Sequence, residues 1–372
     1  MKSFSRAATT PAGFVLLLAC LIAGPQSAVS KPKKPPPAPV VEVPAPPPPV
    51  VLSGRVIEQA SAYRGYMIRV QSISPAFTDG ASVARSVKIG AAYEPVQFLR
   101  GAVAYGAVAA MQDPTFMANV RTYAADPGQR RAIAAQLRAD PAYAGVFKGA
   151  DSAAGLVMAA LGNEGLSLFN AGKAVKQSAY DVQHSAWSKA DIPGRPARLE
   201  DAKMLSRTPL MPEEAETGRL VRAANAGGPM GLTASSVPPP YTPVVLRSLA
   251  VAALAALGEA GDENYELLVP LLSDPASATC FNMAKLNLFQ CLAVAKPHYE
   301  DVFCLGQHIM MDTGQCLIRA SGAPLPPELL PKPPKVLPVG LPVVTKTKGP
   351  GKGAPKAAPK GAAKGAAKGG RH

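Results

Sequence analysis

Four of the five cysteines of this chain lie in one segment, Cys280-FNMAKLNLFQ-Cys291-LAVAKPHYEDVF-Cys304-LGQHIMMDTGQ-Cys316. A turn is predicted at 296–298, where the sequence reads Lys-Pro-His. The two inner cysteines lie about equally far from this turn, and the two outer ones lie further away on either side. Two antiparallel helices joined at the turn would place each pair face to face. The spacing therefore predicts a helical hairpin closed by two nested disulfides.

The nested pairing joins Cys280 to Cys316 and Cys291 to Cys304. The main alternative joins neighbours in sequence, 280 to 291 and 304 to 316. If each segment is helical, that alternative links residues about three turns apart, well beyond the ~7 Å Cα separation that a disulfide spans. The predicted helices run over 282–295 and 298–311. The arrangement resembles the twin-cysteine hairpins of the coiled-coil-helix–coiled-coil-helix type, a resemblance that implies geometry and no function.

A metal site competes for part of this hairpin. Glu300, Cys304 and His308 are spaced i, i+4 and i+8 along one helical face, and His298 is near them in sequence. Zinc accepts carboxylate, thiolate and imidazole ligands. We prefer the interpretation in which Cys304 forms a disulfide and His308 is a surface residue. No metal and no cofactor is predicted.

The N-terminus has the pattern of a secretory signal peptide. Basic Lys2 and Arg6 precede an apolar run at 13–23, which is too short to cross a bilayer, and Ala28-Val29-Ser30 fits a cleavage site. Cleavage there leaves four cysteines, an even number that suits an oxidising compartment. The alternative is a lipobox at 17–20, with Cys20 lipidated. We expect a periplasmic or secreted protein, with the lipoprotein as the less favoured form.

The net charge of +14 is concentrated in the tails. Residues 331–372 contain nine lysines, one arginine and no acidic residue, and the leader and residues 31–50 each contribute +2. Residues 51–330 are left with equal numbers of acidic and basic side chains. A basic groove on the folded body is therefore not predicted, and the basicity belongs to segments outside it.

The composition of both tails predicts disorder. Residues 31–50 are half proline and form a Pro-rich spacer, and 323–372 becomes a Lys/Ala/Pro/Gly-rich tail whose composition resembles that of linker-histone tails. One interpretation is a solvated tail that aids solubility. The other is adhesion to a polyanion such as lipopolysaccharide, anionic lipid or cell-wall polymer, genomic nucleic acid being the least expected. The candidate polyanion-binding residues are Lys346, Lys348, Lys352, Lys356, Lys360, Lys364, Lys368 and Arg371.

The body between the tails is predicted to be all-α, a multi-helix bundle. We expect a helical body at 51–192, an irregular connection at 193–243 with one helix inside (212–225), and a helical unit at 244–322 that includes the hairpin. Glu94-Pro95 and four Asp-Pro pairs each combine a capping carboxylate with proline at the first helical position. These pairs are at 113, 126, 140 and 274.

Two further helices are predicted inside the body. The longest runs over 151–190 and contains Gly155, Gly162, Gly165 and Gly172. Because glycine weakens a helix by roughly 1 kcal/mol relative to alanine, this set indicates close approach of another helix or a break near 162–165. The apolar segment 246–257 is too short to span a membrane and is predicted to be a buried central helix.

Catalytic motifs are absent: the chain has no nucleophile elbow, no HExxH, no GxGxxG after a strand and no phosphate-binding loop. The sequence does not exclude a catalytic pair of carboxylates, as used for glycan cleavage, because the two residues of such a pair meet only in the folded chain. The eligible acids are Asp201, Glu213, Glu214 and Asp262. His184 is expected at the surface, and Trp187, the only tryptophan, is expected to cover the core.

Three stretches carry a resemblance to a known family: Ser74-PAFTD-Gly80, Tyr123-AAD-Pro127 and the hairpin segment 296–308. On these the chain resembles an uncharacterised family of secreted helical bacterial proteins without assigned activity. The resemblance implies export, a helical fold and the cysteine hairpin. We expect an envelope scaffold or binding protein that is tethered by its basic tail. Whether its body also binds a protein partner is left open. The alternatives are a cell-wall hydrolase using a carboxylate pair, and a polyanion- or nucleic-acid-binding protein acting through the tail.

Overall fold

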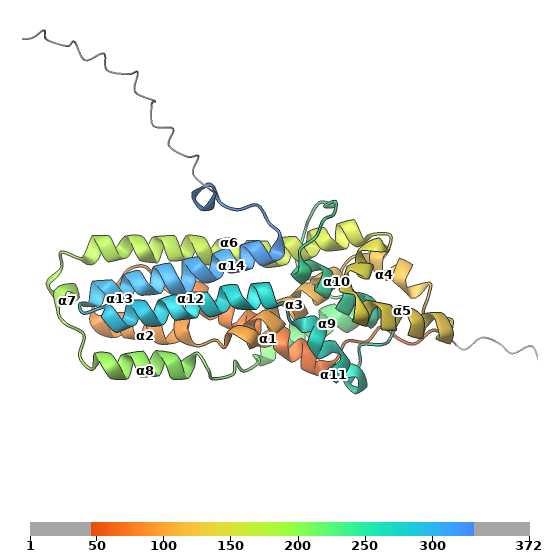
Figure 1. Cartoon of the computed structure of the whole chain (residues 1–372), viewed down its shortest axis with the longest axis horizontal. Helices are drawn as coiled ribbons and strands as arrows, with labels where there is room; N and C mark the ends of the chain where they lie inside the picture. Colours follow the sequence, from red (N-terminus) through yellow and green to blue (C-terminus); the bar gives the residue numbers. More distant parts are fainter. Residues whose placement is uncertain (1–45, 331–372) are drawn as a thin grey trace, which may run out of the picture.

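The computed structural model describes residues 46–330, and this range contains fourteen α-helices and no β-strand (Figure 1). The α-helices are α1 Gly54–Gln71, α2 Gly80–Ala91, α3 Pro95–Ala110, α4 Pro114–Arg121, α5 Pro127–Ala139, α6 Ala150–Val182, α7 Ala186–Lys189, α8 Arg195–Leu205, α9 Glu214–Ala226, α10 Pro243–Ala256, α11 Tyr265–Leu268, α12 Pro275–Val294, α13 His298–Cys304 and α14 Asp312–Ser321. Short 3-10 helices are η1 Pro141–Val146, η2 Asp262–Asn264, η3 Val269–Leu272 and η5 Pro327–Leu329, and η4 Leu305–Met311 is a π-helix. The all-α prediction is confirmed. The predicted leader, most of the Pro-rich spacer and the basic segment 331–372 lie outside the described residues.

The helices are arranged in an elongated body with two ends (Figure 1). At one end α6 and α8 form the two long edges, joined by α7, with α12, α13 and α14 between them. The other end contains α4, α5, α9, α10 and α11. The described chain enters at this second end, beside α5, and leaves from the side of α6.

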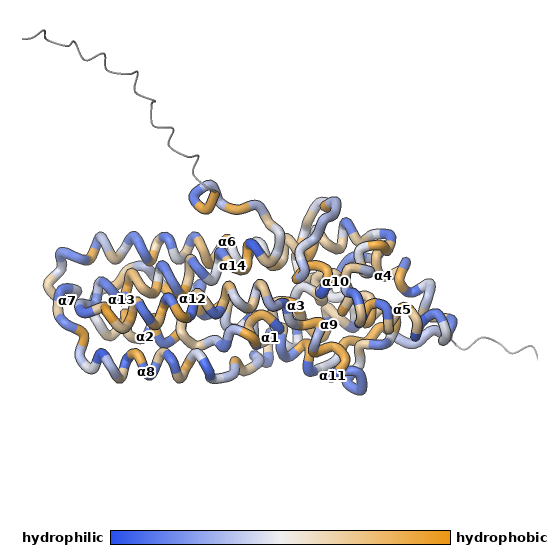
Figure 2. The backbone as a smooth tube through the Cα atoms, in the orientation of Figure 1, coloured by the Kyte–Doolittle hydropathy of each residue, from blue (hydrophilic) through white to orange (hydrophobic). Residues whose placement is uncertain are grey.

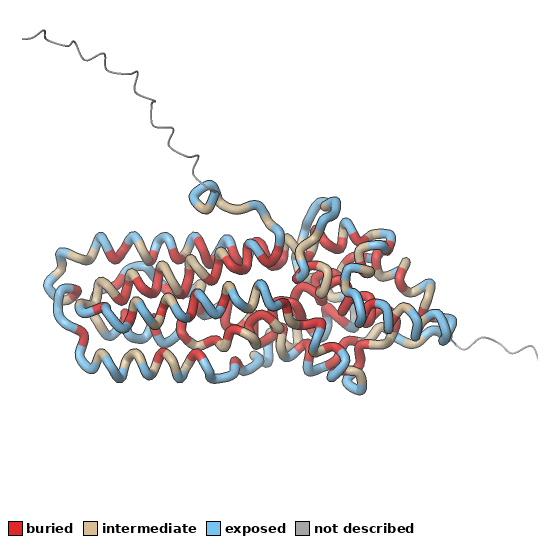
Figure 3. Tube along the Cα trace, viewed as in Figure 1, coloured by how far each residue is buried: buried red, intermediate tan, exposed pale blue. Residues whose placement is uncertain are grey.

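One hydrophobic core extends through both predicted helical units. Its buried members include Val56 of α1, Leu161 of α6, Leu254 of α10 and Leu317 of α14. Helix α10 is buried along nearly its whole length, which confirms the predicted central helix (Figure 3). In the edge helices α6 and α8, hydrophobic and hydrophilic residues alternate along the backbone (Figure 2), as expected where one face meets the core.

The predicted N-caps are present. Asp113 Oδ1 accepts a hydrogen bond from the Phe116 amide at 2.7 Å, and Asp126 Oδ1 accepts one from Gln129 at 2.6 Å. Glu94 caps α3 with both carboxylate oxygens. Each bond satisfies an amide that the first helical turn leaves without a partner. Asp140 caps a 3-10 helix rather than an α-helix.

The hairpin forms with the preferred connectivity. Cys280 is bonded to Cys316 and Cys291 to Cys304, each pair with a Cα–Cα separation of 5.7 Å. The first helix, α12, begins earlier than expected because the cap of Asp274 starts it at Pro275. The second helix is much longer than the predicted 298–311, since α13, the π-helix and α14 follow one another without a break to Ser321.

Close packing on α6 explains why this second helix contains glycine at positions 306 and 314. A Cβ at Gly314 would lie 2.7 Å from the Gly165 carbonyl oxygen of α6, and a Cβ at Gly306 would lie 2.5 Å from the Lys176 amide nitrogen. The predicted close approach to the long helix is thus confirmed, and the alternative of a break near 162–165 is wrong, because α6 is continuous through Val182.

The π-helix keeps these two glycines on the same face. Gly314 is eight positions after Gly306, and in a regular α-helix the two glycines would point about 80° apart. The wider turn of η4 between them reduces this difference, so both glycines contact α6.

Two predicted boundaries need correction. The long helix ends at Val182 rather than near 190, and α7 follows after a turn. The region 193–243 contains α8 as well as the predicted helix now seen as α9. Gly194, in the left-handed conformation with φ 64°, and Pro196 stand at the start of α8. Proline is tolerated in the first turn of a helix, so these residues start α8 rather than continue the irregular connection expected at 193–243.

Helix α2 is fixed to the hairpin by a buried lysine. Lys285 of α12 donates from Nζ to the carbonyl oxygen of Ala91, the last residue of α2, at 2.7 Å. Its ammonium group also lies 3.4 Å from the centre of the Tyr93 ring. Burial lowers the pKa of Lys285 well below its ordinary value, against the opposite effect of Glu94. Nothing in the local sequence of α12 indicates that the Lys285 side chain meets the C-terminus of α2.

Candidate functional site

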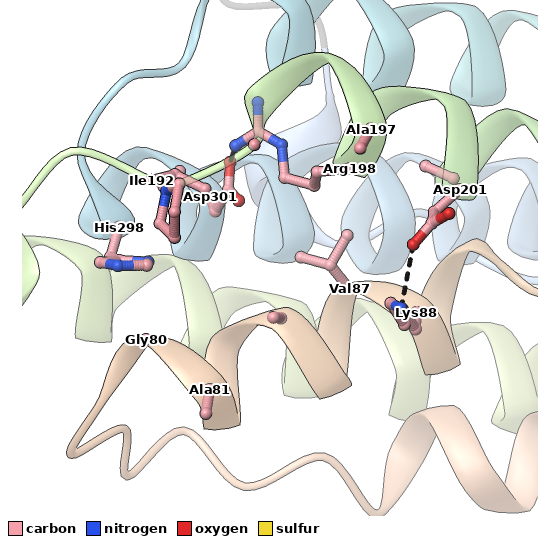
Figure 4. Close-up of a pocket in the computed structure, with 14 residues that line it drawn as sticks. Gly80, Ala81, Val87, Lys88, Ile192, Ala197, Arg198, Asp201, His298 and Asp301 are labelled. Carbon is pink, nitrogen blue, oxygen red and sulfur yellow. Dashed lines mark hydrogen bonds and ion pairs between the residues drawn. The ribbon is translucent and has the colours of Figure 1, made fainter.

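A pocket of about 570 Å³ opens between α2, α8 and the start of α13 (Figure 4). Its walls are mainly apolar. They include Ala81, Ala84, Val87, Ile192, Ala197 and Ala202. Polar side chains are few and come from all three helices, which is the usual composition of a site for a small ligand.

The most buried polar feature of the pocket is an ion pair between Arg198 and Asp301. Their side chains are only 10% and 2% exposed, and Arg198 Nη1 donates to Asp301 Oδ1. Arg198 Nη2 donates to the carbonyl oxygen of Leu292 near the end of α12. Arg195 donates to the carbonyl oxygens of the same helix end, with Nε 2.7 Å from Ala295 O. Two arginines of α8 thus donate hydrogen bonds to the carbonyl groups that the C-terminus of α12 leaves without a helical partner. Positive charge is favourable at this end of a helix.

One donor of Arg198 has no partner within the described residues. Its Nε is buried, and no acceptor of the described chain is in hydrogen-bond range. The buried Nε atoms of Arg64, Arg100 and Arg138 also lack a partner within the described residues, so this feature is not particular to the pocket. Arg198 lines the pocket, and its guanidinium group points toward Asp301 in Figure 4. Because Arg198 Nε is covered by the surrounding protein, it is not a donor open to a group inside the pocket.

The carboxyl group of Asp301 is perturbed by its surroundings. Burial raises the pKa of Asp301 to about 6, although the charge and hydrogen bond of Arg198 act in the opposite direction. Desolvation disfavours the ionised form, and here it exceeds the attraction of the guanidinium.

We expect Asp301→Asn to change how stability depends on pH. The folded protein binds the Asp301 proton more tightly than the unfolded chain does, because its pKa is raised from 3.8 to about 6. This contribution is fully present below pH 3.8 and is lost as the pH rises through 6. Relative to Asp301→Asn, the wild type should lose about 1–3 kcal/mol between pH 4 and pH 7. Urea unfolding of both proteins across this range measures it; parallel curves would show that the pKa of Asp301 is ordinary.

A second ion pair stands at the rim. Lys88 Nζ of α2 lies 2.9 Å from Asp201 Oδ2 of α8, and both side chains are about half exposed (Figure 4). Because this pair joins the two helices that form opposite walls, its opening would widen the entrance. Solvent weakens such a pair, so little free energy opposes that opening.

His298 forms the end of the pocket at the N-terminus of α13. A Cβ on Gly80 would lie 2.3 Å from its ring, so the imidazole packs directly on the start of α2. Burial, and then the charge of Arg198, lower the pKa of His298 below 6.5. The ring is therefore a neutral polar group at neutral pH. With two cations and two acids around it, the pocket has no excess of either charge.

The four carboxylates considered as candidates for a hydrolytic pair do not line a common pocket. Only Asp201 lines this pocket. Glu213 pairs with Arg69 of α1, Glu214 is exposed, and Asp262 accepts a hydrogen bond from Ser53 Oγ at 2.5 Å. Asp301, which sequence reasoning did not select, is the second acid of the pocket.

The competing metal ligands are also separated. Cys304 is committed to its disulfide, and His308 Nδ1 lies 2.8 Å from Asp312 Oδ2. Within residues 46–330, no three His, Cys, Asp or Glu side chains lie close enough together to hold a metal ion. His184 is exposed, and Trp187 is partly buried against the core, as expected for both.

Sequence reasoning missed Arg198, Lys88 and Asp301, and it considered His298 only as a metal ligand. The one available signal was the helix start at 194–196, which would have placed Arg195 and Arg198 on one helix. The candidate polyanion-binding residues 346–371 and Cys20 lie outside the described part of the chain.

The chain matches no protein-family model, no curated protein and no solved structure. Its resemblance to secreted helical bacterial proteins stays an expectation. Among the described helices, none combines the length and hydrophobicity needed to span a bilayer. The class of site must therefore be inferred from its own chemistry: a mainly apolar pocket with a buried arginine–aspartate ion pair in its wall.

Proposed function

We propose that this is an exported, non-catalytic binding protein of the bacterial envelope. Its helical body would bind a small ligand in the pocket between α2, α8 and α13. Its basic C-terminal segment would hold that body on anionic envelope material. The observation that carries the proposal is the separation of charge: residues 331–372 hold ten basic and no acidic side chains, whereas residues 51–330 sum to zero.

The ion pairs of the body support this division of roles. Arg64 pairs with Glu164, and both Arg130 and Arg138 pair with Glu259. These pairs use arginines that would otherwise contribute to a basic face. Adhesion to polyanions then depends on the tail, and the body is free for a different interaction.

Export is supported by the two disulfides and by the leader-like N-terminus. Disulfides persist in oxidising compartments and are rare in the cytosol. The four bonded cysteines are those that remain after cleavage at residue 30.

The pocket favours a small, mainly apolar ligand, because apolar side chains form most of its walls. Its apolar walls are alanine, valine and isoleucine, and its charged side chains form two ion pairs, Lys88–Asp201 and Arg198–Asp301. Because each of its carboxylates is already paired with a cation, the pocket holds few groups free for acid–base chemistry.

Neutralising the tail tests the tethering role. Replacing Lys346, Lys348, Lys352, Lys356, Lys360, Lys364, Lys368 and Arg371 by glutamine should weaken binding to vesicles rich in anionic lipid by at least roughly a hundredfold, since each basic residue near such a surface contributes about 1 kcal/mol. Co-sedimentation measures the change.

The matched control exchanges lysine for arginine at the seven lysine positions, which keeps the charge and should keep the binding. Wild-type binding should also fall steeply with salt. Equal sedimentation of the glutamine and wild-type chains would contradict the proposal. Tighter binding to DNA than to lipid or lipopolysaccharide would favour the nucleic-acid class instead.

A glycan-cleaving hydrolase is the second candidate, because one observation favours it. Asp201 and Asp301 line the same pocket, and the raised pKa of Asp301, about 6, suits a general acid. The test is incubation with purified cell-wall glycan. Release of new reducing ends that Asp301→Asn abolishes would replace our proposal with this one.

A further inference from the structure

A second concave surface lies on the other side of α13 from the ligand pocket. It has a volume of about 550 Å³ and is formed by α6, the end of α12 and α13. We call it the α6–α13 groove. Its lining residues are Ala179, Tyr180, Gln183, Cys291, Val294, Ala295, Tyr299, Glu300, Phe303 and Cys304.

The groove exposes aromatic and aliphatic side chains to solvent. Tyr180 is 48% exposed and Val294 is 73% exposed. The ring of Tyr180 meets that of Phe303 nearly at right angles, with centroids 6.4 Å apart. Tyr299 adds a third aromatic residue to the wall. Large apolar groups left exposed together often mark a binding surface.

Aromatic-lined grooves are well suited to proline-rich segments. Such segments are already extended before they bind, so little conformational entropy is lost, and proline rings pack well on aromatic faces. The chain contains such a segment directly after the last described residue: 331–344 reads PKPPKVLPVGLPVV.

The described chain ends within reach of the groove. Glu328 of η5 forms an ion pair with Lys173 of α6, which places the exit of the described chain beside that helix. Lys173 and Tyr180 are seven residues apart on α6, so they lie on one face about 10 Å apart. Fourteen extended residues span roughly 40 Å, enough to run along the whole groove.

Charge and position both favour this occupant. Glu300 lines the groove, and Lys332 and Lys335 lie in the segment, which contains no acidic residue. The other proline-rich segment, 31–50, joins the described chain beside α5, at the opposite end of the body (Figure 1). There Arg121 holds the Pro48 carbonyl, with Nη1 at 3.2 Å.

We propose that residues 331–344 occupy the α6–α13 groove of the same molecule, with their prolines on Tyr180 and Phe303. The lysine-rich residues 346–371 would then begin at a fixed place on the body. This inference rests on the proposed function, because it says where on the body the basic tether begins. The contact between residues 331–344 and the groove does not depend on what the tether binds.

The test uses the full chain with a photo-crosslinking residue, p-benzoylphenylalanine, in place of Tyr180. The expected result after irradiation in dilute solution is a crosslinked monomer whose peptides join position 180 to 331–344 by mass spectrometry. The same residue in place of Leu267, which is exposed on α11 at the other end, serves as control and should give no such product. Circular dichroism verifies that both chains fold.

Replacing Pro333, Pro334 and Pro338 by glycine in the Tyr180-substituted chain should reduce the crosslink yield roughly tenfold, because glycine, unlike proline, does not favour the extended conformation that the proposed contact requires. Crosslinks to residues 31–50, to a second copy, or to no part of 331–344 would each overturn the inference. No envelope material is present, so this outcome is independent of the tail-neutralisation test.

Discussion

Removing the outer disulfide by replacing Cys280 and Cys316 with alanine is expected to lower the free energy of unfolding by about 4 kcal/mol, and removing the inner one about 3 kcal/mol. The outer bond closes a loop of sequence separation 36 and the inner one a loop of 13. A longer closed loop restricts the unfolded chain more strongly. Urea unfolding at neutral pH measures both losses.

The two double variants serve as controls for each other, because both remove two sulfur atoms from the same hairpin. The variant in which all four of these cysteines are replaced by alanine should have the same free energy of unfolding with and without a reducing agent. The wild type should be less stable when the reducing agent is present. A larger loss for the inner pair than for the outer pair would contradict the nested, entropic account.

Replacing Gly314 by valine is the second substitution with a large expected effect. Even the first side-chain atom would lie 2.7 Å from the Gly165 carbonyl oxygen and the Phe169 amide nitrogen of α6. Both obstacles are backbone atoms, so the two helices must move apart. Overpacking of this kind destabilises by about 1–3 kcal/mol or more, and we expect the upper end of this range.

Gly218→Val is the matched control, because Gly218 also lies inside a helix, α9, and a Cβ there meets only an Arg222 side-chain nitrogen at 3.5 Å. We expect a change within about 0.5 kcal/mol for this control. Thermal and urea unfolding of both variants give the comparison. Equal losses at the two positions would show that helix propensity, and not close packing on α6, determines the cost.

The parts of the fold that follow from short-range chemistry were predictable. The Asp-Pro pairs and Glu94-Pro95 start helices because a carboxylate and a proline act within one turn. The nested disulfides followed from the symmetry of cysteine spacing around one turn. The glycines of α6 indicated that another helix packs closely on it. They did not identify that helix, since Gly306 and Gly314, which make the contact, lie far away in sequence.

The candidate site was not predictable in the same way. Its residues come from three segments, 80–88, 192–202 and 298–301, that meet only in the folded chain. The second segment contains Pro193, Gly194 and Pro196, which resemble a loop in composition although they start α8. The contact of Lys285 with the end of α2 was not predictable either, because nothing local indicates that its amino group reaches the Ala91 carbonyl oxygen.

The most direct test of the whole account is the intact mass of the native protein recovered from the envelope fraction, followed by disulfide mapping. We predict a chain that begins at Lys31 and is four hydrogen atoms lighter than its reduced form, with bonds from Cys280 to Cys316 and from Cys291 to Cys304. Four free thiols, or an uncleaved leader on a protein found in the cytosol, would contradict an exported helical body held by its basic tail.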